Sequence, residues 1–241
     1  MCYMTSITMK LDHIEIRFEA EFRDRERFKP VYSASAFVFP WMPVISNEEP
    51  RTIDFYQWGL IPFWVKNVDS AKKIRSRTLN ARAETIFRKP AFRHAIRTQR
   101  CLILVDGFYE WRHENNKKYP YYIRLSQENA FALAGIWDTW LDGKTGNPLK
   151  TFSIITTQAN SLLDKIHNTR KRMPVILKQS DEKRWLEPDL PQNQIESMLM
   201  PFDADKLEAY TVSKTITKLG LNTTEPSVVE RHQYSDLAGI D

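Results

Sequence analysis

Cys101-Leu102-Ile103-Leu104-Val105-Asp106-Gly107-Phe108-Tyr109-Glu110-Trp111 is the stretch of this sequence that decides the fold. The apolar residues at its start predict a buried strand, and Asp106-Gly107 is a turn signal. The turn is followed by a carboxylate, Glu110, between Tyr109 and Trp111. Burial between aromatic rings raises a carboxyl pKa and gives a proton donor or acceptor near neutral pH. The alternative is an exposed Glu at a strand end, with its aromatic neighbours in the core.

Short strands and short helices surround this stretch, without the regular alternation of βαβ units. We predict an α+β fold, with residues 1–241 as a single β-rich domain that has a folded or barrel-like sheet and short flanking helices. Turn residues at 142–148 predict a hairpin. Strands are expected at Ile53–Leu60, Cys101–Val105, Tyr119–Leu125, Ala130–Trp140, Phe152–Thr157, Met173–Leu177 and Ala209–Ser213, with short strands and turns over Tyr32–Pro50. Helices are expected at His13–Phe28, Phe92–Arg97, Ala159–Ile166, Asp181–Leu186 and Asn193–Leu199.

The composition excludes several classes of protein. Hydrophobic residues make up 42% and charged residues 27%, which is typical of a globular protein. The two cysteines, Cys2 and Cys101, are too few for a disulfide framework or a four-ligand zinc site. Gly-rich phosphate loops, serine nucleophile elbows and membrane-length apolar runs are missing, so we expect neither a cofactor nor a metal nor a membrane. A monomer in the cytoplasm, near the nucleoid in a bacterium, is expected, and the net charge of +5 suits a polyanionic partner.

Met1-Cys2 provides a reactive group of unusual chemistry. Removal of the initiator Met would leave Cys2 with a free α-amine beside its thiol. Their ordinary pKa values are about 8 and about 8.5, so both are partly deprotonated nucleophiles near neutral pH. With an aldehyde, a 1,2-aminothiol forms an imine and then a five-membered thiazolidine. The alternative is an incidental cysteine on a loose terminus.

Two further segments carry candidate side chains for chemistry. Asn80 either caps a following helix or holds a substrate oxygen, with Arg82 on a phosphate. His167 adjoins the basic run Arg170-Lys171-Arg172, where cations would bind phosphate while the imidazole moves protons. The alternative for that run is a solvated basic loop. The other histidines lie among ordinary surface charges: His13, His94, His113 and His232.

Basic segments alternate with aromatic and proline-rich segments. This pattern suits single-stranded nucleic acid, where cations follow the backbone and aromatic rings stack on bases. Two other hypotheses remain open: a cysteine peptidase with Cys2 and His167 as nucleophile and base, and a single-stranded DNA-binding protein that forms no covalent bond. The DNA contacts expected from these segments are Trp64, Arg77, Arg82, Arg170, Lys171 and Arg172.

Six segments in order resemble the SOS-response-associated peptidase (SRAP) family, and they span nearly the whole chain. They are Met1-Cys2, Trp58–Trp64, Asn80–Thr85, Gly107–Trp111, Ala134–Trp137, and His167 with Arg172-Met173-Pro174. The resemblance implies the SRAP fold and a protein that senses abasic sites in single-stranded DNA during the DNA damage response. It further implies a covalent thiazolidine cross-link through Cys2 that shields the lesion, by lyase-like Schiff-base chemistry. The family is also described as a thiol autopeptidase.

The resemblance also implies roles for four residues. Cys2 attacks the aldehyde, and Glu110 assists proton transfer. Asn80 positions the deoxyribose and the cysteine, and His167 moves protons to the sugar oxygen and assists reversal. As DNA contacts, the resemblance implies Arg82 on a phosphate, with Trp111, Pro40 and Trp41 flanking the lesion. The chain departs from the family at Tyr3-Met4, where Gly-Arg is usual, and at residues 168–171, which separate His167 from Arg172. The additional cations there are expected to replace the missing arginine.

Overall fold

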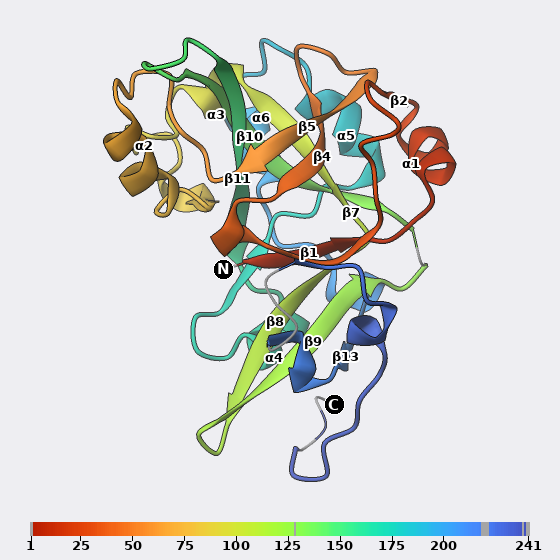
Figure 1. The fold of residues 1–241 in the computed structure, drawn as a ribbon. Helices are drawn as coiled ribbons and strands as arrows, with labels where there is room; N and C mark the ends of the chain where they lie inside the picture. The colour runs from red at the N-terminus through yellow and green to blue at the C-terminus, as the bar shows by residue number, and fades with distance from the viewer. Residues whose placement is uncertain (1, 128, 218–221, 238, 240–241) are drawn as a thin grey trace.

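Two β-sheets with short helices around them build the chain in this computed structural model (Figure 1), which describes residues 2–127, 129–217, 222–237 and 239. Met1, whose removal the sequence predicts, lies outside the described residues. The strands are β1 (Met4–Ile7), β2 (Glu21–Phe22), β3 (Val31–Ser35), β4 (Trp41–Ser46), β5 (Thr52–Trp58), β6 (Asn80–Arg82), β7 (Arg100–Val105), β8 (Gly107–Glu114), β9 (Lys117–Leu125), β10 (Phe131–Leu141), β11 (Pro148–Gln158), β12 (Arg172–Pro174), β13 (Leu207–Thr211) and β14 (Asn222–Thr223). The α-helices are α1 (Leu11–Phe18), α2 (Val68–Arg75), α3 (Ala95–Thr98), α4 (Ser161–Ile166), α5 (Gln179–Trp185) and α6 (Gln192–Met198). The 3-10 helices are η1 (Ala36–Val38), η2 (Ala83–Thr85), η3 (Ala204–Lys206), η4 (Lys214–Thr217) and η5 (Pro226–Val229).

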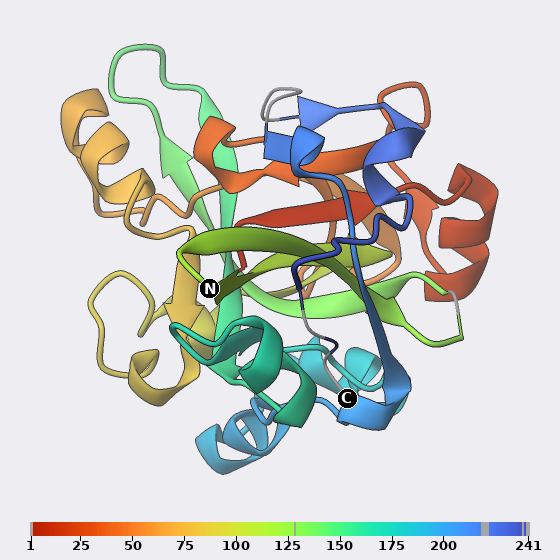
Figure 2. The same ribbon diagram turned by 90° about the horizontal axis from the view of Figure 1, so that it is seen from below.

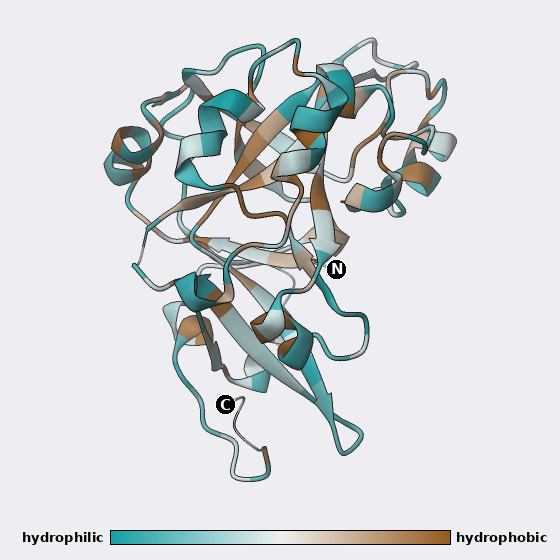
Figure 3. Cartoon of the chain, turned by 180° about the vertical axis from the view of Figure 1, so that it is seen from behind, coloured by the Kyte–Doolittle hydropathy of each residue, from teal (hydrophilic) through white to brown (hydrophobic). Residues whose placement is uncertain are grey.

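The larger sheet closes on itself to form a barrel. Its strands follow the order β12-β11-β10-β7-β4-β5-β2, and β5 also pairs in parallel with β11. This pairing completes the ring β11-β10-β7-β4-β5, which leaves those strands without free edges. Trp58 and Phe152 stack where the ring closes, with centroids 5.8 Å apart. Apolar residues concentrate on the barrel strands (Figure 3). The predicted β-rich α+β fold with a barrel-like sheet is confirmed.

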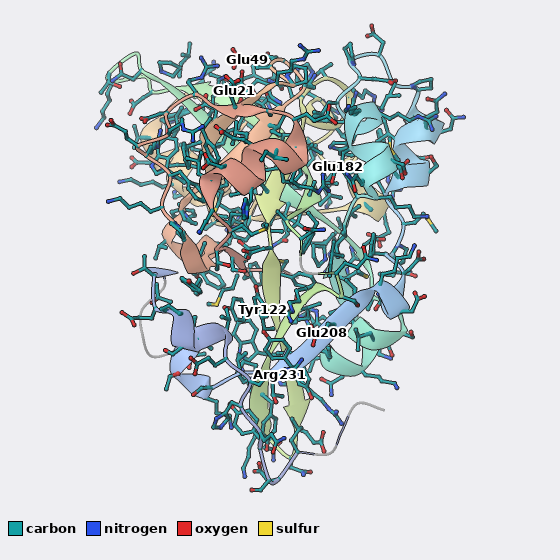
Figure 4. The ribbon with its side chains drawn as sticks, turned by 90° about the vertical axis from the view of Figure 1, so that its right-hand side faces the viewer. Glu21, Glu49, Tyr122, Glu182, Glu208 and Arg231 are labelled. Carbon is teal, nitrogen blue, oxygen red and sulfur yellow. The ribbon has the colours of Figure 1, made fainter. Side chains whose placement is uncertain are left out.

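The second sheet has the order β13-β9-β8-β1-β3-β14. Its strands β8, β9 and β13 extend below the barrel in Figure 1, and Figure 2 shows the red strand β1 along the green strand β8. On the face shown in Figure 4, Glu208 of β13 forms an ion pair with Arg231 and accepts a 2.8 Å hydrogen bond from Arg124. These contacts tie the C-terminal segment to the second sheet.

The stretch from Cys101 to Trp111 crosses from one sheet to the other. Its apolar half is the fully buried strand β7 of the barrel, and its second half is β8. Asp106 lies between them and accepts hydrogen bonds from the hydroxyls of Ser6 at 2.6 Å and Thr8 at 2.7 Å. Gly107 is required here, because an added Cβ would lie 2.2 Å from the ring of Tyr122 (labelled in Figure 4). The corner therefore fixes β1, which leads back to Cys2.

The helix predicted for residues 13–28 is correct only in its first half. Helix α1 ends at Phe18 because Glu19 adopts a left-handed conformation with φ of 51°. Phe22 has the helical spacing expected of an apolar face, but it lies in β2, which pairs with β5. Sheet pairing thus outweighs the local periodicity.

Three other elements differ from the sequence prediction. Helix α2 lies in a polar segment for which no helix is predicted, and its start is capped by the Asn67 side chain, which accepts from the Ser70 amide at 2.8 Å. Helix α3 covers only the end of the helix predicted at residues 92–97. The strand predicted at 173–177 is shorter, since β12 ends at Pro174 and Ile176 forms one isolated bridge with Leu133. Within the described residues, none of the helices is long and apolar enough to span a bilayer.

Candidate functional site

An open cleft of about 650 Å³ lies beside the start of β1. A cleft of this volume suits a small ligand or part of a larger one. It collects side chains from the residue before β1, from the β8–β9 hairpin, from the loop after α4 and from η4. The lining residues are Tyr3, Glu110, Trp111, His113, Lys118, His167, Thr169, Arg170 and Thr217.

Cys2 lies next to this cleft and is fully buried, with 0% of its surface exposed. In the β1–β8 ladder Thr5 lies opposite Phe108, and continuing that register two residues brings the chain at Tyr3 toward Glu110. The Cys2 Sγ lies 3.8 Å from the Met4 carbonyl oxygen. Burial raises the pKa of the Cys2 thiol well above its ordinary value, and the charge of Glu110 adds to that effect. The thiol is therefore protonated at neutral pH.

Asn80 connects the barrel to the N-terminal segment. It lies in β6, opposite Ile154 of β11, and its Nδ2 donates a 2.9 Å hydrogen bond to the Cys2 carbonyl oxygen. Its Oδ1 is buried and has no hydrogen-bond partner among the described residues. The helix-cap alternative for Asn80 is wrong, because the residue belongs to a strand. The same amide thus holds the Cys2 backbone and keeps one acceptor available.

Glu110 and His167 form a buried pair of titratable groups. Glu110 is 3% exposed and His167 is 7% exposed. Glu110 Oε1 lies 3.5 Å from His167 Nδ1, and that nitrogen lies 2.9 Å from the Arg172 carbonyl oxygen. Burial raises the pKa of Glu110 to about 8 and lowers the pKa of His167 to about 4. At neutral pH the carboxyl group is therefore a proton donor and the imidazole is neutral.

The loop that carries His167 is held in place by Asn168. The Asn168 Nδ2 donates to the His113 carbonyl at 2.7 Å, and its Oδ1 accepts from the His113 amide at 3.1 Å. His167 itself ends α4, and its backbone amide donates to the Leu163 carbonyl at 2.7 Å. Asn168 thus fastens the start of the loop between His167 and Arg172 to strand β8. This pairing brings His113, predicted to lie among surface charges, into the lining of the cleft.

The three cations after His167 have different environments. Arg170 lines the cleft. Lys171 is exposed and contacts Asp164 at 3.0 Å. Arg172 is 9% exposed, donates to the Thr156 carbonyl at 2.7 Å and forms a two-point ion pair with Glu84. Arg172 therefore supports β12, and the structure does not place its guanidinium where a phosphate would meet it.

The structure gathers some of the other predicted DNA contacts near the cleft. Trp111 is partly buried and lines it. Arg82 is exposed at the end of β6. Burial raises the pKa of the Tyr3 hydroxyl, and the positive charges of Arg170 and Arg82 partly offset that rise. Both cations are therefore close enough to influence a group that lines the cleft.

The remaining predicted contacts lie outside the lining of the cleft. Trp41 is 43% exposed, and the Arg27 guanidinium lies over its ring at 4.4 Å. Trp64 and Arg77 are exposed on the segments before and after α2. Pro40 is buried, so we omit it from the candidate interface.

Phe37 lies beside the cleft and is not among the residues predicted from the sequence. Its ring lies 5.0 Å from the ring of Tyr3, which lines the cleft. The only signal for Phe37 was the density of aromatic residues between 32 and 50. Within the described part of the chain, the structure contains no cluster of His, Cys, Asp or Glu side chains that suits a metal ion.

Comparison with known proteins gives one consistent result. The family model described as SOS response associated peptidase (SRAP) matches residues 1–219. The chain is 37% identical to "Abasic site processing protein YoqW" of Bacillus subtilis over 235 residues, covering 96% of this chain and all of the relative. It is 30% identical over 202 residues to "Abasic site processing protein HMCES" of Gallus gallus, covering 75% of this chain and 58% of that protein. A crystal structure of a protein from Bacteroides thetaiotaomicron matches with a TM-score of 0.91 and 42% identity, covering 96% of this chain and all of that one.

Proposed function

Because the chain belongs to the SOS response associated peptidase (SRAP) family, we propose that it processes abasic sites in DNA and captures them covalently through Cys2. The names of two relatives, "Abasic site processing protein" YoqW and HMCES, support the lesion as the substrate. The single observation that carries the covalent mechanism is the hydrogen bond of 2.9 Å from Asn80 to the Cys2 carbonyl. This bond holds the backbone of Cys2 in place, near the buried carboxyl group of Glu110. Once Met1 is removed, Cys2 is a 1,2-aminothiol.

The proposed reaction forms two bonds and releases one water. The α-amine of Cys2 adds to the C1′ aldehyde of the ring-opened abasic sugar and gives a carbinolamine. Loss of its hydroxyl as water gives a protonated imine, and the Cys2 sulfur then adds to the imine carbon. The nitrogen keeps its remaining hydrogen, the thiol proton returns to the Glu110 carboxylate, and the new carbon–sulfur bond closes the thiazolidine. Ring closure is intramolecular, so the buried thiol needs no separate encounter with the substrate.

Glu110 is suited to both proton transfers of this sequence. Its pKa of about 8, raised by burial, leaves it protonated at neutral pH, so it protonates the departing hydroxyl. The resulting carboxylate then takes the proton of the Cys2 thiol, whose pKa responds to the Glu110 charge. The neutral imidazole of His167 receives and returns protons at the sugar oxygen, which also allows the reverse reaction.

The cleft favours single-stranded DNA as the partner. It is open, and Arg170 and Lys118 in its lining attract phosphates, while Trp111 offers an aromatic face. Arg82 at the end of β6 adds a further cation, and the exposed Lys171 another. We propose that a monomer acts alone and that residues 1–241 work as one domain, since the site draws on both sheets.

The peptidase hypothesis is less well supported by the site. A cysteine peptidase needs a thiolate, and its cysteine has a lowered pKa. Burial raises the pKa of the Cys2 thiol instead. An imine-first reaction tolerates a protonated thiol because the amine attacks first.

Incubation with an abasic single-stranded oligonucleotide, followed by denaturing electrophoresis, tests the proposal. We expect a stable adduct with the wild type and none with Cys2→Ala, and Cys101→Ala is the matched control because its thiol is equally buried. An adduct with Cys2→Ala would exclude the proposed nucleophile. Peptide hydrolysis that requires Cys2 and ignores abasic DNA would favour the peptidase, and binding without an adduct would favour a non-covalent protein.

A further inference from the structure

Phe37 and Val38 are exposed apolar side chains beside the cleft. Phe37 is 60% exposed and Val38 is 40% exposed, although both lie in the short turn η1 between two strands of the core. Exposed apolar groups that lie close together often mark a binding surface.

The turn is held rigidly in this conformation. Phe39, which ends it, has φ of 54°, a left-handed backbone that is strained for a bulky residue. The Arg75 guanidinium lies 4.2 Å from the centre of the Phe39 ring, and Arg75 in turn donates to the Gln57 side chain at 2.8 Å. Gly59 makes room for this packing, because an added Cβ would lie 2.7 Å from Arg75 Cγ. The packing of Phe39 against Arg75 thus supports the end of the turn that carries Phe37.

Phe37 is connected to the reactive site through Tyr3. Their ring centroids lie 5.0 Å apart at an angle of 32°. The backbone is joined as well, since the Ala36 amide donates to the Tyr3 carbonyl at 2.9 Å. Tyr3 lines the cleft with Arg170 and adjoins Cys2 in the chain. An aromatic surface thus continues from the mouth of the cleft, next to cations that suit a phosphate backbone.

We propose that Phe37, supported by Tyr3, is a stacking platform for the unpaired base next to the abasic nucleotide. The inference rests on the proposed function. An abasic nucleotide has no base, so the neighbouring base loses a stacking partner, and an aromatic ring beside the cleft can replace it. Stacking on aromatic side chains is independent of base identity and contributes substantially to single-strand binding. The platform therefore favours a base flanking the lesion without reading its sequence.

Equilibrium binding tests the platform in a Cys2→Ala background, where no covalent bond forms. The probe is a single-stranded oligonucleotide with a stable tetrahydrofuran abasic analogue and 2-aminopurine next to it. We expect quenching of 2-aminopurine fluorescence on binding. Phe37→Ala should abolish the quenching and weaken binding about five-fold to a hundred-fold, and Phe37→Trp should retain both. Leu141→Ala, in an equally exposed apolar residue of β10, is the control and should change neither.

Two results would overturn the platform. One is unchanged affinity and quenching in Phe37→Ala with a native circular dichroism spectrum. The other is a Phe37→Ala variant whose sedimentation without DNA differs from that of the parent protein while its DNA affinity is unchanged. That result would assign the surface of Phe37 and Val38 to self-association. The proposed function fails separately: quenching that depends on Phe37, together with no adduct by the wild type, would keep the platform and reject covalent capture.

Discussion

The side-chain amide of Asn80 donates a 2.9 Å hydrogen bond to the backbone carbonyl of Cys2, which lies 78 residues earlier in the chain. This bond links β6, which pairs with the barrel strand β11, to the residue two places before β1, and this is the residue proposed to carry the nucleophile. The amide oxygen of Asn80 is buried and unpaired among the described residues, and in the proposed mechanism it accepts from the Cys2 amine or a sugar hydroxyl.

Asn80→Ala should slow adduct formation about ten-fold to a hundred-fold, because the amine loses its orientation relative to the aldehyde. The loss of one hydrogen bond should cost only about 1 kcal/mol of unfolding free energy. Single-turnover rates with abasic single-stranded DNA and urea unfolding measure the two effects. Asn80→Asp retains the acceptor and removes the donor, so a rate equal to that of Asn80→Ala would show that the donated bond is the one that matters. A normal rate in both variants would contradict the positioning role.

The sequence predicted the burial of Glu110 but not its neighbours. Its place between Tyr109 and Trp111, after an apolar strand, indicated desolvation but left an exposed strand-end Glu as the alternative, and the residue is 3% exposed. The bond from Asn80 to Cys2 joins two sheets, so it depends on barrel closure rather than on local pattern. The pairing of Asn168 with His113 is likewise a tertiary contact that no spacing in the chain reveals.

The fold was predictable where burial and turns dominate the sequence. The apolar run 101–105 correctly predicted β7, and the turn residues 142–148 correctly predicted the β10–β11 hairpin. Helix α2 was missed because its stability depends on its Asn67 cap and on Ala71 and partly buried neighbours, rather than on a clear apolar stripe. The end of α1 was missed because Glu19 adopts the left-handed conformation usually taken by glycine.

Glu110→Gln should change the pH dependence of adduct formation as well as its rate. The raised pKa means that Glu110 is protonated below about pH 8 and loses its proton above it. Formation by the wild type should therefore rise as the amine deprotonates and fall as pH increases through about 8. The Gln variant should be slower by about a hundred-fold or more and should lack the alkaline decline. An alkaline decline of equal midpoint in the variant would show that another group controls it.

The same substitution should alter how stability depends on pH. Glu110 keeps its proton in the folded state up to about pH 8, whereas the unfolded chain releases it near the ordinary glutamate pKa of 4.5. The folded state thus binds more protons in this window, and its stability decreases as pH rises from about 4.5 to about 8. Glu110→Gln should reduce this pH-dependent decrease in the free energy of unfolding, which urea unfolding at several pH values measures. A steeper dependence in the variant would contradict the sign.

His167→Ala should impair reversal of the cross-link more than DNA binding. The imidazole has a pKa lowered to about 4 by burial, so it is neutral at physiological pH and acts as a proton carrier rather than a phosphate-binding cation. Release of abasic DNA from purified adduct should be slower, whereas the Kd measured in the Cys2→Ala background should change little. Equal losses in both assays would assign His167 to binding.

Arg172→Ala should destabilise the fold by about 2–4 kcal/mol, because it leaves Glu84 and the Thr156 carbonyl without their partner. Lys171→Ala is the matched control from the same basic run, since the exposed pair with Asp164 contributes less than about 1 kcal/mol. Urea unfolding followed by tryptophan fluorescence compares them. The reverse order of stabilities would contradict the structural role of Arg172.

Intact-mass spectrometry of the protein, before and after incubation with an abasic single-stranded oligonucleotide, tests the central claim most directly. The account predicts a starting mass that lacks Met1, and a product equal to the protein plus the oligonucleotide minus one water. Cys2→Ala should give no such product. A wild-type protein that lacks Met1 and shows only its own mass after incubation, or a Cys2→Ala product of full yield, would contradict covalent capture by Cys2.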